Sequence, residues 1–427
     1  MEENDKKVSA EGKRGFLNGL FTGVLAVILV GTTVFCVKQV MTLYGNKTSV
    51  LAAQDEFSEK GTNDDGAVVS ENVMEKMEAI EQIIDYYYYQ EDIDEEALED
   101  GIYKGMIDSL GDPYSTYYSE EELADIMEQT EGIYYGIGAY ISLDLKTGLG
   151  KISGVIEGTP AQAANLREGD LIYMVDGESA AGLELSEIVS RIKGEEGTTV
   201  HLTLVREGEN DYVEVDIERR EVESPTVKYE VYDNKTGYIQ ITEFDDITVD
   251  QFTEALAVCK GSGVKGLILD LRSNPGGNLS AVVDIARQIL PEGMIVYTED
   301  RDGKRTEYTC KGENKLEIPM VVLINGNSAS ASEILAGAIK DHKIGTLVGT
   351  TSFGKGIVQR IIGLQDGSAV KLTVSSYFTP SGNNIHGIGI EPDVVCEFDS
   401  EDYYDNGIDN QLEEGKRVLQ ELIEKGN

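Results

Sequence analysis

A serine-rich segment between a predicted strand and a predicted helix carries the first group that could do chemistry. After an apolar run and before a helical pattern, the chain reads Asn327-Ser328-Ala329-Ser330-Ala331-Ser332-Glu333. A serine at such an elbow projects its hydroxyl group, and the next backbone N–H, that of Ala331, points to where an oxyanion would form. The same spacing, Ser330-x-x-Glu333, is typical of a capping box at a helix start. The pattern by itself leaves both interpretations open.

A serine hydroxyl group is weakly nucleophilic and needs a neighbouring base. The candidate is Lys355, which lies between Gly354 and Gly356. Glycines let the backbone turn tightly and bring the amine close to another loop. A lysine can act as a base once its pKa falls from about 10.4 toward neutrality, and Gln359, four residues on, can hydrogen-bond to it. The alternative is a solvated loop lysine.

Two other catalytic arrangements are possible interpretations of the same region. Asp341-His342 suggests a Ser-His-Asp triad, but adjacent side chains rarely orient one another. Ser352-x-x-Lys355 has the spacing of penicillin-binding enzymes, and residues 235–237 and 381–383 mimic their other two elements. In those enzymes the serine begins a helix and the Lys-Thr-Gly element comes last. Here that element comes first and the glycines discourage a helix, so this reading is disfavoured as well.

A glycine-rich turn after another apolar run provides possible oxyanion donors. The segment 270–277 reads Asp-Leu-Arg-Ser-Asn-Pro-Gly-Gly and leads into a helical pattern. Glycines at this place expose backbone N–H groups, which suit an anion or an oxyanion. An ordinary strand-to-helix turn would look the same. The segment is not a phosphate-binding loop, because GxxxxGK[ST] is missing.

A second pair of glycines opens the β-rich part of the chain. Tyr135-Gly136-Ile137-Gly138-Ala139 precedes a predicted strand, and such a backbone nest can take a peptide's terminal carboxylate while the strand edge pairs with the peptide. Alone this signal is weak. It gains specificity because Gly158-Thr159-Pro160-Ala161 and Gly169-Asp170-Leu171-Ile172 follow in order.

The hydrophobic pattern predicts an α/β multidomain protein. A helical region is expected over 68–130, and short β runs with a hairpin (200–206 and 212–218) follow it up to about 220. From Val227 onward, strands and helices alternate, which predicts an α/β domain with its active groups on the loops after the strands. The expected strands are 237–241, 266–271, 320–324 and 347–349, and the expected helices are 249–260, 279–290, 332–339 and 410–424.

An uncharged stretch near the N-terminus predicts a transmembrane signal anchor. Residues 16–37 hold no charged side chain, and as a helix they would cover about 33 Å. Lys6, Lys7, Lys13 and Arg14 precede the stretch, so the rest of the chain should lie outside the cytoplasm. A cleaved signal peptide is the alternative, although its apolar region is usually shorter. Residues 38–67 read as a linker.

The composition excludes several classes of partner. The 427 residues carry 36 Lys and Arg against 78 Asp and Glu, a formal net charge of −42, which argues against binding to nucleic acid. Four cysteines without a CxxC and three scattered histidines predict neither a disulfide scaffold nor a metal site. No motif points to a cofactor.

Taken together, these motifs resemble the carboxy-terminal processing peptidases, also called tail-specific serine proteases. The resemblance runs in order from Val68 to the C-terminus and includes a closing Gly387-Ile388-Gly389-Ile390-Glu391-Pro392-Asp393. It implies a PDZ domain and a serine protease core like the Clp-protease/crotonase fold. The resulting organisation is a cytoplasmic tail (1–15), a transmembrane helix (16–37), a linker (38–67), a helical region (68–130), a PDZ domain (131–220), a protease core (221–400) and a helical tail (401–427).

The resemblance also implies roles for individual residues. Ser330, the middle serine of its motif, is the nucleophile, Lys355 the general base and Gln359 the residue that orients the lysine, while Asp341 matches an aspartate sometimes implicated in the family. The oxyanion hole is formed by the N–H of Ala331 and a glycine N–H, foremost that of Gly276, with Gly277 beside it. The residues expected to bind the peptide tail are Gly136, Ile137, Gly138 and Ala139.

The expected function is that of a bacterial endopeptidase with a Ser-Lys dyad, held at the cell membrane by a single helix and active outside the cytoplasm. Its expected partners are proteins and peptides with exposed apolar C-termini, and the resemblance implies a homodimer. The alternative from another class is a PDZ peptide-binding scaffold without catalytic activity.

Overall fold

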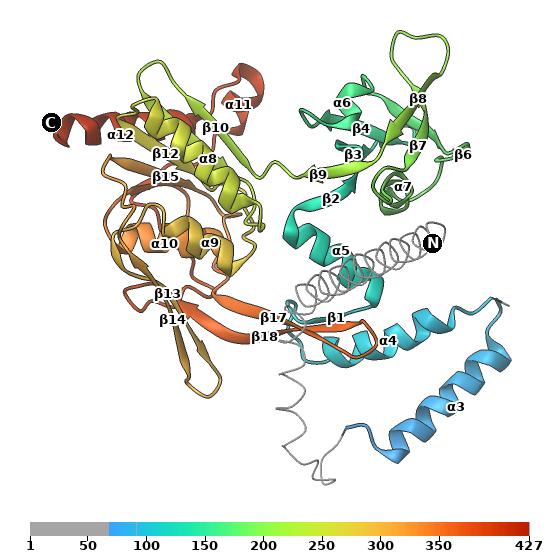
Figure 1. Ribbon diagram of the computed structural model, residues 1–427. Helices are drawn as coiled ribbons and strands as arrows, with labels where there is room; N and C mark the ends of the chain where they lie inside the picture. Colours follow the sequence, from blue (N-terminus) through green and yellow to red (C-terminus); the bar gives the residue numbers. More distant parts are fainter. Residues whose placement is uncertain (1–67, 91, 427) are drawn as a thin grey trace, which may run out of the picture. The chain divides into compact units, whose positions relative to one another are not determined.

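The computed structural model describes residues 68–90 and 92–426. The chain divides into two compact units (Figure 1). The first runs to Ser119 and includes Ile361–Lys371, and the second comprises Glu120–Arg360 together with the chain from Leu372 onward. The predicted cytoplasmic tail, transmembrane helix and linker lie outside the described residues. Within 68–90 and 92–426, no helix is both long enough and apolar enough to cross a membrane.

Two helices and a short strand lie within residues 68–90 and 92–119, the described part of the first unit before Glu120. The helices, α3 (Glu71–Tyr87) and α4 (Glu95–Asp108), lie in the region predicted to be helical. α4 begins after Asp94, whose carboxylate accepts the N–H of Ala97 as an N-cap. The sequence patterns did not predict β1 (Thr116–Tyr118), which pairs antiparallel with residues 369–371. Its partner is far along the chain, so no local periodicity reveals it.

The second unit contains an antiparallel sheet that packs around an apolar core of its own. α5 (Glu120–Glu131) leads into β2 (Ile133–Gly136), which pairs with β9 (Arg220–Glu223) in a separate two-stranded sheet. The larger sheet has the order β3-β4-β5-β7-β8, with β6 paired to β5, and includes the predicted hairpin β7–β8. Its strands are β3 (Ala139–Leu143), β4 (Gly150–Val155), β5 (Leu171–Val175), β6 (Glu178–Ser179), β7 (Thr199–Val205) and β8 (Val213–Glu218). Two helices complete it, α6 (Pro160–Ala163) and α7 (Leu185–Ile192).

A six-stranded sheet forms the centre of the α/β part, with the order β10-β11-β12-β15-β16-β19. All neighbours are parallel except β10 and β11. The strands are β10 (Val227–Val231), β11 (Thr236–Ile241), β12 (Gly266–Asp270), β15 (Met320–Ile324), β16 (Thr346–Gly349) and β19 (Val394–Val395). The helices are α8 (Thr248–Gly261), α9 (Leu279–Ala286), α10 (Ala331–Asp341), α11 (Ser400–Asn406) and α12 (Asn410–Gly426). α9 is shorter than predicted because its last turn tightens to i−3 hydrogen bonds at Gln288 and Ile289.

Both faces of this sheet are buried, because successive side chains along a strand point to opposite faces. In β12, Leu267 and Leu269 join the large apolar cluster that contains residues of α8, α9 and α10. Ile268 points the other way, into a smaller cluster with Leu419 of α12. The central strands are therefore continuous apolar runs, as expected for parallel strands covered on both sides.

A second sheet carries the segment that follows the candidate lysine. Within the second unit it has the order β18-β13-β14, with β17 paired to β18. Its longer strands are β13 (Glu292–Asp300), β14 (Arg305–Lys311), β17 (Ile357–Gly363) and β18 (Ala369–Phe378). β17 begins directly after the loop that holds Lys355, so this sheet fixes the far end of that loop.

An ion pair is buried inside the β-rich domain. Arg206, after β7, donates from Nε and Nη2 to both carboxylate oxygens of Asp170 at 2.7 Å, and from Nη2 to the carbonyl of Asn165. The Asp170 side chain is 1% exposed and that of Arg206 9%. The hydrogen bond to Asp170 raises the pKa of Arg206. The pair joins two segments that border the sheet.

We expect Asp170→Ala to lower the free energy of unfolding by about 3–5 kcal/mol, because it leaves a buried guanidinium without its partner. Glu178→Ala is the control, since it removes one partner of the exposed Arg191–Glu178 pair and should cost less than about 1 kcal/mol. Denaturant titrations of both variants measure the difference. Equal losses would contradict the structural role of the Asp170–Arg206 pair.

Candidate active site

Three loops that carry the predicted catalytic groups meet at one edge of the central sheet. They follow β12, β15 and β16, which are parallel neighbours in that order. The carboxyl ends of parallel strands lie at the same edge, so residues 271–278, 325–330 and 350–356 are brought together although they are far apart in sequence. Direct hydrogen bonds confirm the meeting: Ala329 N–H donates to Asn274 O at 3.0 Å, and Phe353 N–H donates to Ser328 O at 3.0 Å.

Ser330 sits at a sharp elbow just before α10. Its backbone has φ 53° and ψ −114°, a region that non-glycine residues rarely occupy and that is found mainly where the surrounding structure enforces it. The hydroxyl groups of the two flanking serines are buried and engaged, Ser328 with Leu271 O at 2.8 Å and Ser332 with Asn274 O at 3.0 Å. Ser330 is half-buried. The flanking serines thus fasten the elbow to the glycine loop, and the middle serine is the more accessible one.

The glycine loop presses against this elbow. Gly276 has φ 114°, and a Cβ atom there would lie 2.7 Å from Ser330 Cβ and 3.0 Å from Ala331 N, so only glycine fits. Its N–H, however, donates to Asn274 Oδ1 at 2.8 Å. In this conformation Gly276 leaves room for the Ser330 elbow, while its N–H is hydrogen-bonded to the buried side chain of Asn274. Gly277, the other predicted glycine, has φ 133° and pairs with Phe244.

Glu333 connects the serine elbow to the lysine loop. Its side chain is fully buried, and its carboxylate accepts four hydrogen bonds. Oε1 accepts from Ser352 Oγ at 2.6 Å and from Gly354 N–H at 2.7 Å. Oε2 accepts from the N–H groups of Ser330 and Lys355, both at 2.9 Å. Two nitrogens that share one acceptor at such distances lie within about 6 Å of each other, so the backbones of Ser330 and Lys355 are held side by side.

The sequence suggested a capping role for Glu333 but not this second set of contacts. Its carboxylate does accept the N–H of Ser330, as in the helix-capping interpretation. The donors from 352–355 come from a loop whose position depends on the order of strands in the sheet. The available signal was an acidic residue in the first turn of a predicted helix, three residues after the candidate nucleophile.

Tyr377 of β18 supports the same elbow. Its hydroxyl donates to the carbonyl of Ser330 at 3.1 Å, and its own N–H donates to Gly356 O at 3.0 Å. Burial, with the neighbouring Glu333, raises the pKa of Tyr377 well above its ordinary value. The phenol therefore remains a neutral hydrogen-bond donor to the backbone on one side of the elbow.

The lysine loop is tightly packed at its two glycines. A Cβ atom at Gly354 would lie 2.9 Å from Gly389 N, and one at Gly356 would lie 2.6 Å from His386 N. Ser352 Oγ donates to Glu333 and accepts the N–H of Ile390 at 2.7 Å. Residues 351–356 form no helix. The penicillin-binding arrangement is therefore wrong for this chain, because Ser352 is buried in a structural network instead of beginning a helix.

The other predicted residues lie at different places. Gln359 is on β17, and its side-chain nitrogen donates to Thr373 Oγ1 of β18 at 3.1 Å. Asp341 ends α10, so it lies about 16 Å along the helix from Ser330. There its carboxylate accepts the N–H of Ser381 at 2.9 Å. His342 hydrogen-bonds through Nε2 to Met294 O at 2.7 Å. Nothing in this geometry supports a triad of Ser330 with Asp341 and His342.

Sequence reasoning also missed an ionic cluster behind the glycine loop. Arg272 binds Asp270 and, through a second set of bonds, Asp409 just before α12. Tyr238 donates to Asp270 at 2.9 Å. Burial works to lower the pKa of Arg272, but its hydrogen bonds to the two carboxylates outweigh burial and raise it. The signal was present as charged residues at the end of an apolar strand, in Asp270-Leu271-Arg272.

A further acidic group lies beside the glycine loop. Asp245 is buried next to Phe244, which pairs with Gly277. Burial, followed by the charges of Glu243 and Asp246, raises the pKa of Asp245 to about 7. Below neutral pH this carboxyl group is therefore protonated, which removes one negative charge from the neighbourhood of the glycine loop.

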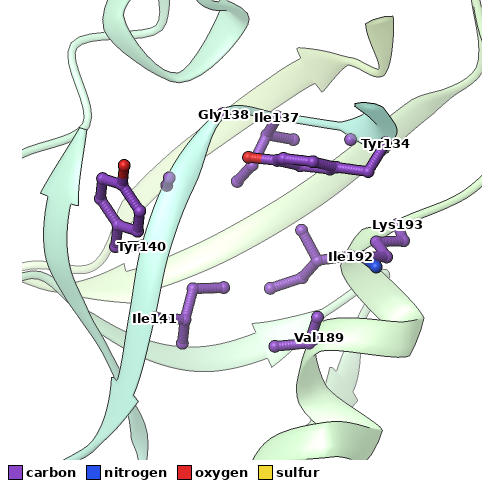
Figure 2. Close-up of a pocket in the computed structure, with 10 residues that line it drawn as sticks. Tyr134, Ile137, Gly138, Tyr140, Ile141, Val189, Ile192 and Lys193 are labelled. Atoms are coloured by element: carbon purple, nitrogen blue, oxygen red, sulfur yellow. The ribbon is translucent and has the colours of Figure 1, made fainter. Parts of the chain in front are cut away.

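The predicted tail-binding residues border an apolar groove in the β-rich domain (Figure 2). The groove has a volume of about 240 Å³ and lies between β3 and α7. Its lining residues are Tyr134, Gly136, Ile137, Gly138, Ala139, Tyr140, Ile141, Val189, Ile192 and Lys193. Gly138 has φ 81°, and a Cβ atom there would overlap Thr159 at 2.3 Å, so this position requires glycine. β3 is at an end of its sheet, where an added strand can pair with it.

Comparison with known proteins identifies the domains. The model of peptidase family S41 matches residues 235–396, that of a PDZ domain matches 151–206, and that of the activating protease CtpB N-terminal domain matches 28–122. The carboxy-terminal processing protease CtpA of Bacillus subtilis (strain 168) is 39% identical over 320 residues, which cover 75% of this chain and 68% of that protein. The chain belongs to the carboxy-terminal processing protease family.

A second curated relative agrees with this placement. CtpB of the same bacterium is 34% identical over 341 residues, which cover 79% of this chain and 70% of CtpB. The solved structure of a photosystem II D1 C-terminal processing protease is 32% identical, with a TM-score of 0.45, over 74% of this chain and 86% of that one. The protein is thus a serine-type carboxy-terminal processing protease with a multidomain α/β architecture that includes PDZ and S41 domains.

We expect Gly276→Ala to reduce proteolysis at least about 100-fold. The added methyl group displaces the elbow of Ser330, the predicted nucleophile, and small displacements of reacting groups carry costs of this size. Gly303→Ala is the matched control. Gly303 also has a positive φ, 78°, but no heavy atom lies within 4 Å of its Cβ position. Cleavage of an unfolded protein measures both variants, and an active Gly276→Ala would contradict the close approach.

We expect Glu333→Gln to reduce the rate at which a fluorophosphonate labels Ser330 at least about tenfold. The new NH₂ group faces hydrogen-bond donors, and each buried donor left without an acceptor costs about 1–3 kcal/mol. Glu307→Gln, on the exposed face of β14, is the control. A melting curve separates a displaced loop from an unfolded core. Labelling at the wild-type rate in a folded Glu333→Gln protein would refute the connecting role of Glu333.

Proposed function

We propose that the protein is a membrane-anchored endopeptidase that captures protein C-termini through its PDZ domain and cleaves peptide bonds with a Ser330–Lys355 dyad. The observation that carries the proposal is the shared acceptor: the N–H groups of both residues donate to Glu333 Oε2 at 2.9 Å. A nucleophile and a base from separate loops must be adjacent, and this carboxylate holds their backbones together. The core is proposed to share the Clp-protease/crotonase fold.

In the proposed reaction, the uncharged amine of Lys355 takes the proton from Ser330 Oγ as that oxygen attacks the scissile carbonyl carbon. The resulting oxyanion accepts hydrogen bonds from the N–H of Ala331 and from that of Gly277, since Gly276 N–H is committed to Asn274. The ammonium of Lys355 then protonates the leaving amine as the C–N bond breaks. Lys355 then takes a proton from water as the water oxygen attacks the acyl carbon. The ammonium returns this proton to Ser330 Oγ as the C–Oγ bond breaks and the acid leaves.

Two predicted residues have supporting roles in this proposal. Gln359 orients Lys355 from the start of β17, where its bond to Thr373 fixes the side chain. Asp341 has a structural role, because its carboxylate accepts the N–H of Ser381 and so stabilises the turn at that residue. Capture of an apolar tail by Gly136, Ile137, Gly138 and Ala139 is supported by the apolar groove and by the free edge of β3.

The location and assembly are proposals based on the sequence. Residues 16–37 anchor the chain, and the basic residues before them keep the N-terminus in the cytoplasm, so proteolysis takes place outside it in a bacterial cell. Assembly as a homodimer is proposed from the family resemblance.

Ser330→Ala and Lys355→Ala should each abolish cleavage of an unfolded protein that ends in apolar residues, because the acyl-enzyme needs both groups. Lys343→Ala, at an exposed lysine after α10, is the control and should retain activity. Activity is measured by the appearance of new N-termini. Cleavage that survives either dyad substitution would refute the dyad. If only the tail-binding activity exists, wild type will bind such proteins without cutting them, which is the scaffold alternative.

A further inference from the structure

Every nitrogen of the Arg272 guanidinium group is engaged behind the glycine loop. Nε and Nη2 donate to the two carboxylate oxygens of Asp270 at 3.0 and 2.6 Å. Nη1 and Nη2 donate to the two oxygens of Asp409 at 2.9 and 2.8 Å, and Nη1 also donates to Gln411 Oε1 at 3.3 Å. Because the donors of a guanidinium form a rigid planar fork, these bonds fix both the position and the orientation of the group.

The two carboxylates belong to elements that are far apart in the chain. Asp270 is the last residue of β12, and its side chain is fully buried. Asp409 precedes α12 and caps this helix, because its Oδ1 also accepts the N–H of Leu412 at 3.0 Å. α12 packs on one face of the central sheet (Figure 1). Arg272 therefore connects the loop after β12 to the start of α12.

The residue after Arg272 has an unusual backbone conformation. Ser273 has φ 58°, a positive value that is uncommon for residues other than glycine. On one side of it, the N–H and the guanidinium of Arg272 bind Asp270. On the other side, Ser273 N–H donates to Asn325 Oδ1 at 2.9 Å, and Asn325 Nδ2 donates to Ser273 Oγ at 3.2 Å. This turn is thus held between the ionic cluster and the loop after β15.

Asn325 connects the turn to the Ser330 elbow. Its N–H donates to Ser328 Oγ at 3.0 Å, and Ser328 N–H donates to Asn325 O at 2.8 Å. Ser328 Oγ in turn donates at 2.8 Å to the carbonyl of Leu271, the residue before Arg272. The hydrogen bonds therefore form a closed circuit that ends two residues from Ser330. Arg272 cannot shift without moving Ser328 or breaking one of these bonds.

We propose that Arg272 is a positioning residue of the active site: by binding Asp409, it lets the start of α12 set the position of the Ser330 elbow. This inference rests on the proposed role of Ser330 as the nucleophile. Arg272 acts through the backbones of two loops, so it is not itself a catalytic residue. The start of α12 then belongs to the catalytic unit as well as to the fold.

Asp409→Asn separates this role from helix capping. Asparagine caps a helix about as well as aspartate does, but the variant loses the charge and one of the two oxygens that face the guanidinium. Hydrogen bonds to ionised groups are about twice as strong as neutral ones, so the elbow is held less firmly. Asp399→Asn is the matched control, because Asp399 caps α11 in the same way through the N–H of Asp402.

Arg272→Lys tests the link from its other end. Lysine keeps the charge but replaces the planar fork with a single ammonium group, which cannot bind two carboxylates in the same geometry. Both changes break one link, so the combined variant should lose at most about twofold more activity than Arg272→Lys alone. Arg417→Lys, at an exposed arginine of α12 that pairs with Glu414, is the control.

The test uses the full-length chain in a non-ionic detergent and a fluorophosphonate that labels Ser330. Labelling at several concentrations of the probe gives the maximal rate and the half-saturating concentration separately, and melting curves report folding. We expect the maximal rate to fall about tenfold in Asp409→Asn and at least about tenfold in Arg272→Lys, because small displacements of a reacting group are costly. The half-saturating concentration should change less than about twofold, and both controls should match the unaltered chain.

A purely structural cluster would lower the melting temperature of Asp409→Asn but leave the labelling rate of the folded protein unchanged, and that result would overturn the proposal. Losses that multiply in the combined variant would also overturn it, since Arg272 and Asp409 would then act by separate routes. If Arg272→Lys does not fold, Asp409→Asn and its control decide the question. If the probe fails to label Ser330 in the unaltered chain, the proposed function itself fails.

Discussion

The carboxylate of Glu333 is the interaction on which the rest of the active site depends. A buried carboxylate is costly unless hydrogen bonds compensate for its lost hydration, and here three backbone N–H groups and the Ser352 hydroxyl do so. Its place in the first turn of α10 adds the favourable field of the helix N-terminus. Because the donors come from two loops, the same bonds that satisfy the charge also fix the distance between the loops. The hydrogen bonds that compensate one buried carboxylate thus also set the geometry of the site.

Backbone strain at Ser330 fits this arrangement. A positive φ at a residue with a side chain costs roughly 1–3 kcal/mol and persists only where neighbours enforce it. Several contacts do so here, including the hydrogen bond from Tyr377 to the Ser330 carbonyl and the close approach of Gly276. The flanking hydroxyl groups of Ser328 and Ser332 bind the glycine loop, so the elbow and that loop form one rigid body. Farther back, Arg272 joins the same loop to Asp409 before α12. Ser330, the proposed nucleophile, is thus held in a position that needs little reorganisation for a reaction.

The PDZ domain differs from the active site in its core and in the burial of its ion pairs. Its apolar core is separate from that of the α/β part, and its groove ends in a side chain that can move. Lys193 is long, flexible and half-exposed, so its pairing with Glu128 is weaker than the fully buried Asp170–Arg206 pair in the same domain. The buried pair maintains the fold, while the more exposed pair beside the groove contributes less to stability.

The local chemistry of the chain was determined by its sequence. The glycines around Lys355 and the serine before an amphipathic helix indicated which loops matter, because turn and elbow geometries need particular residue types at particular positions. The alternating apolar runs indicated an α/β core, since buried parallel strands and covering helices have distinct periodicities. The tertiary structure decided which of these pieces meet. The strand order β12-β15-β16 placed three loops at one edge of the sheet and gave Glu333 its second set of donors. Such outcomes depend on contacts between residues distant in the chain, and no pattern within a single segment contains them.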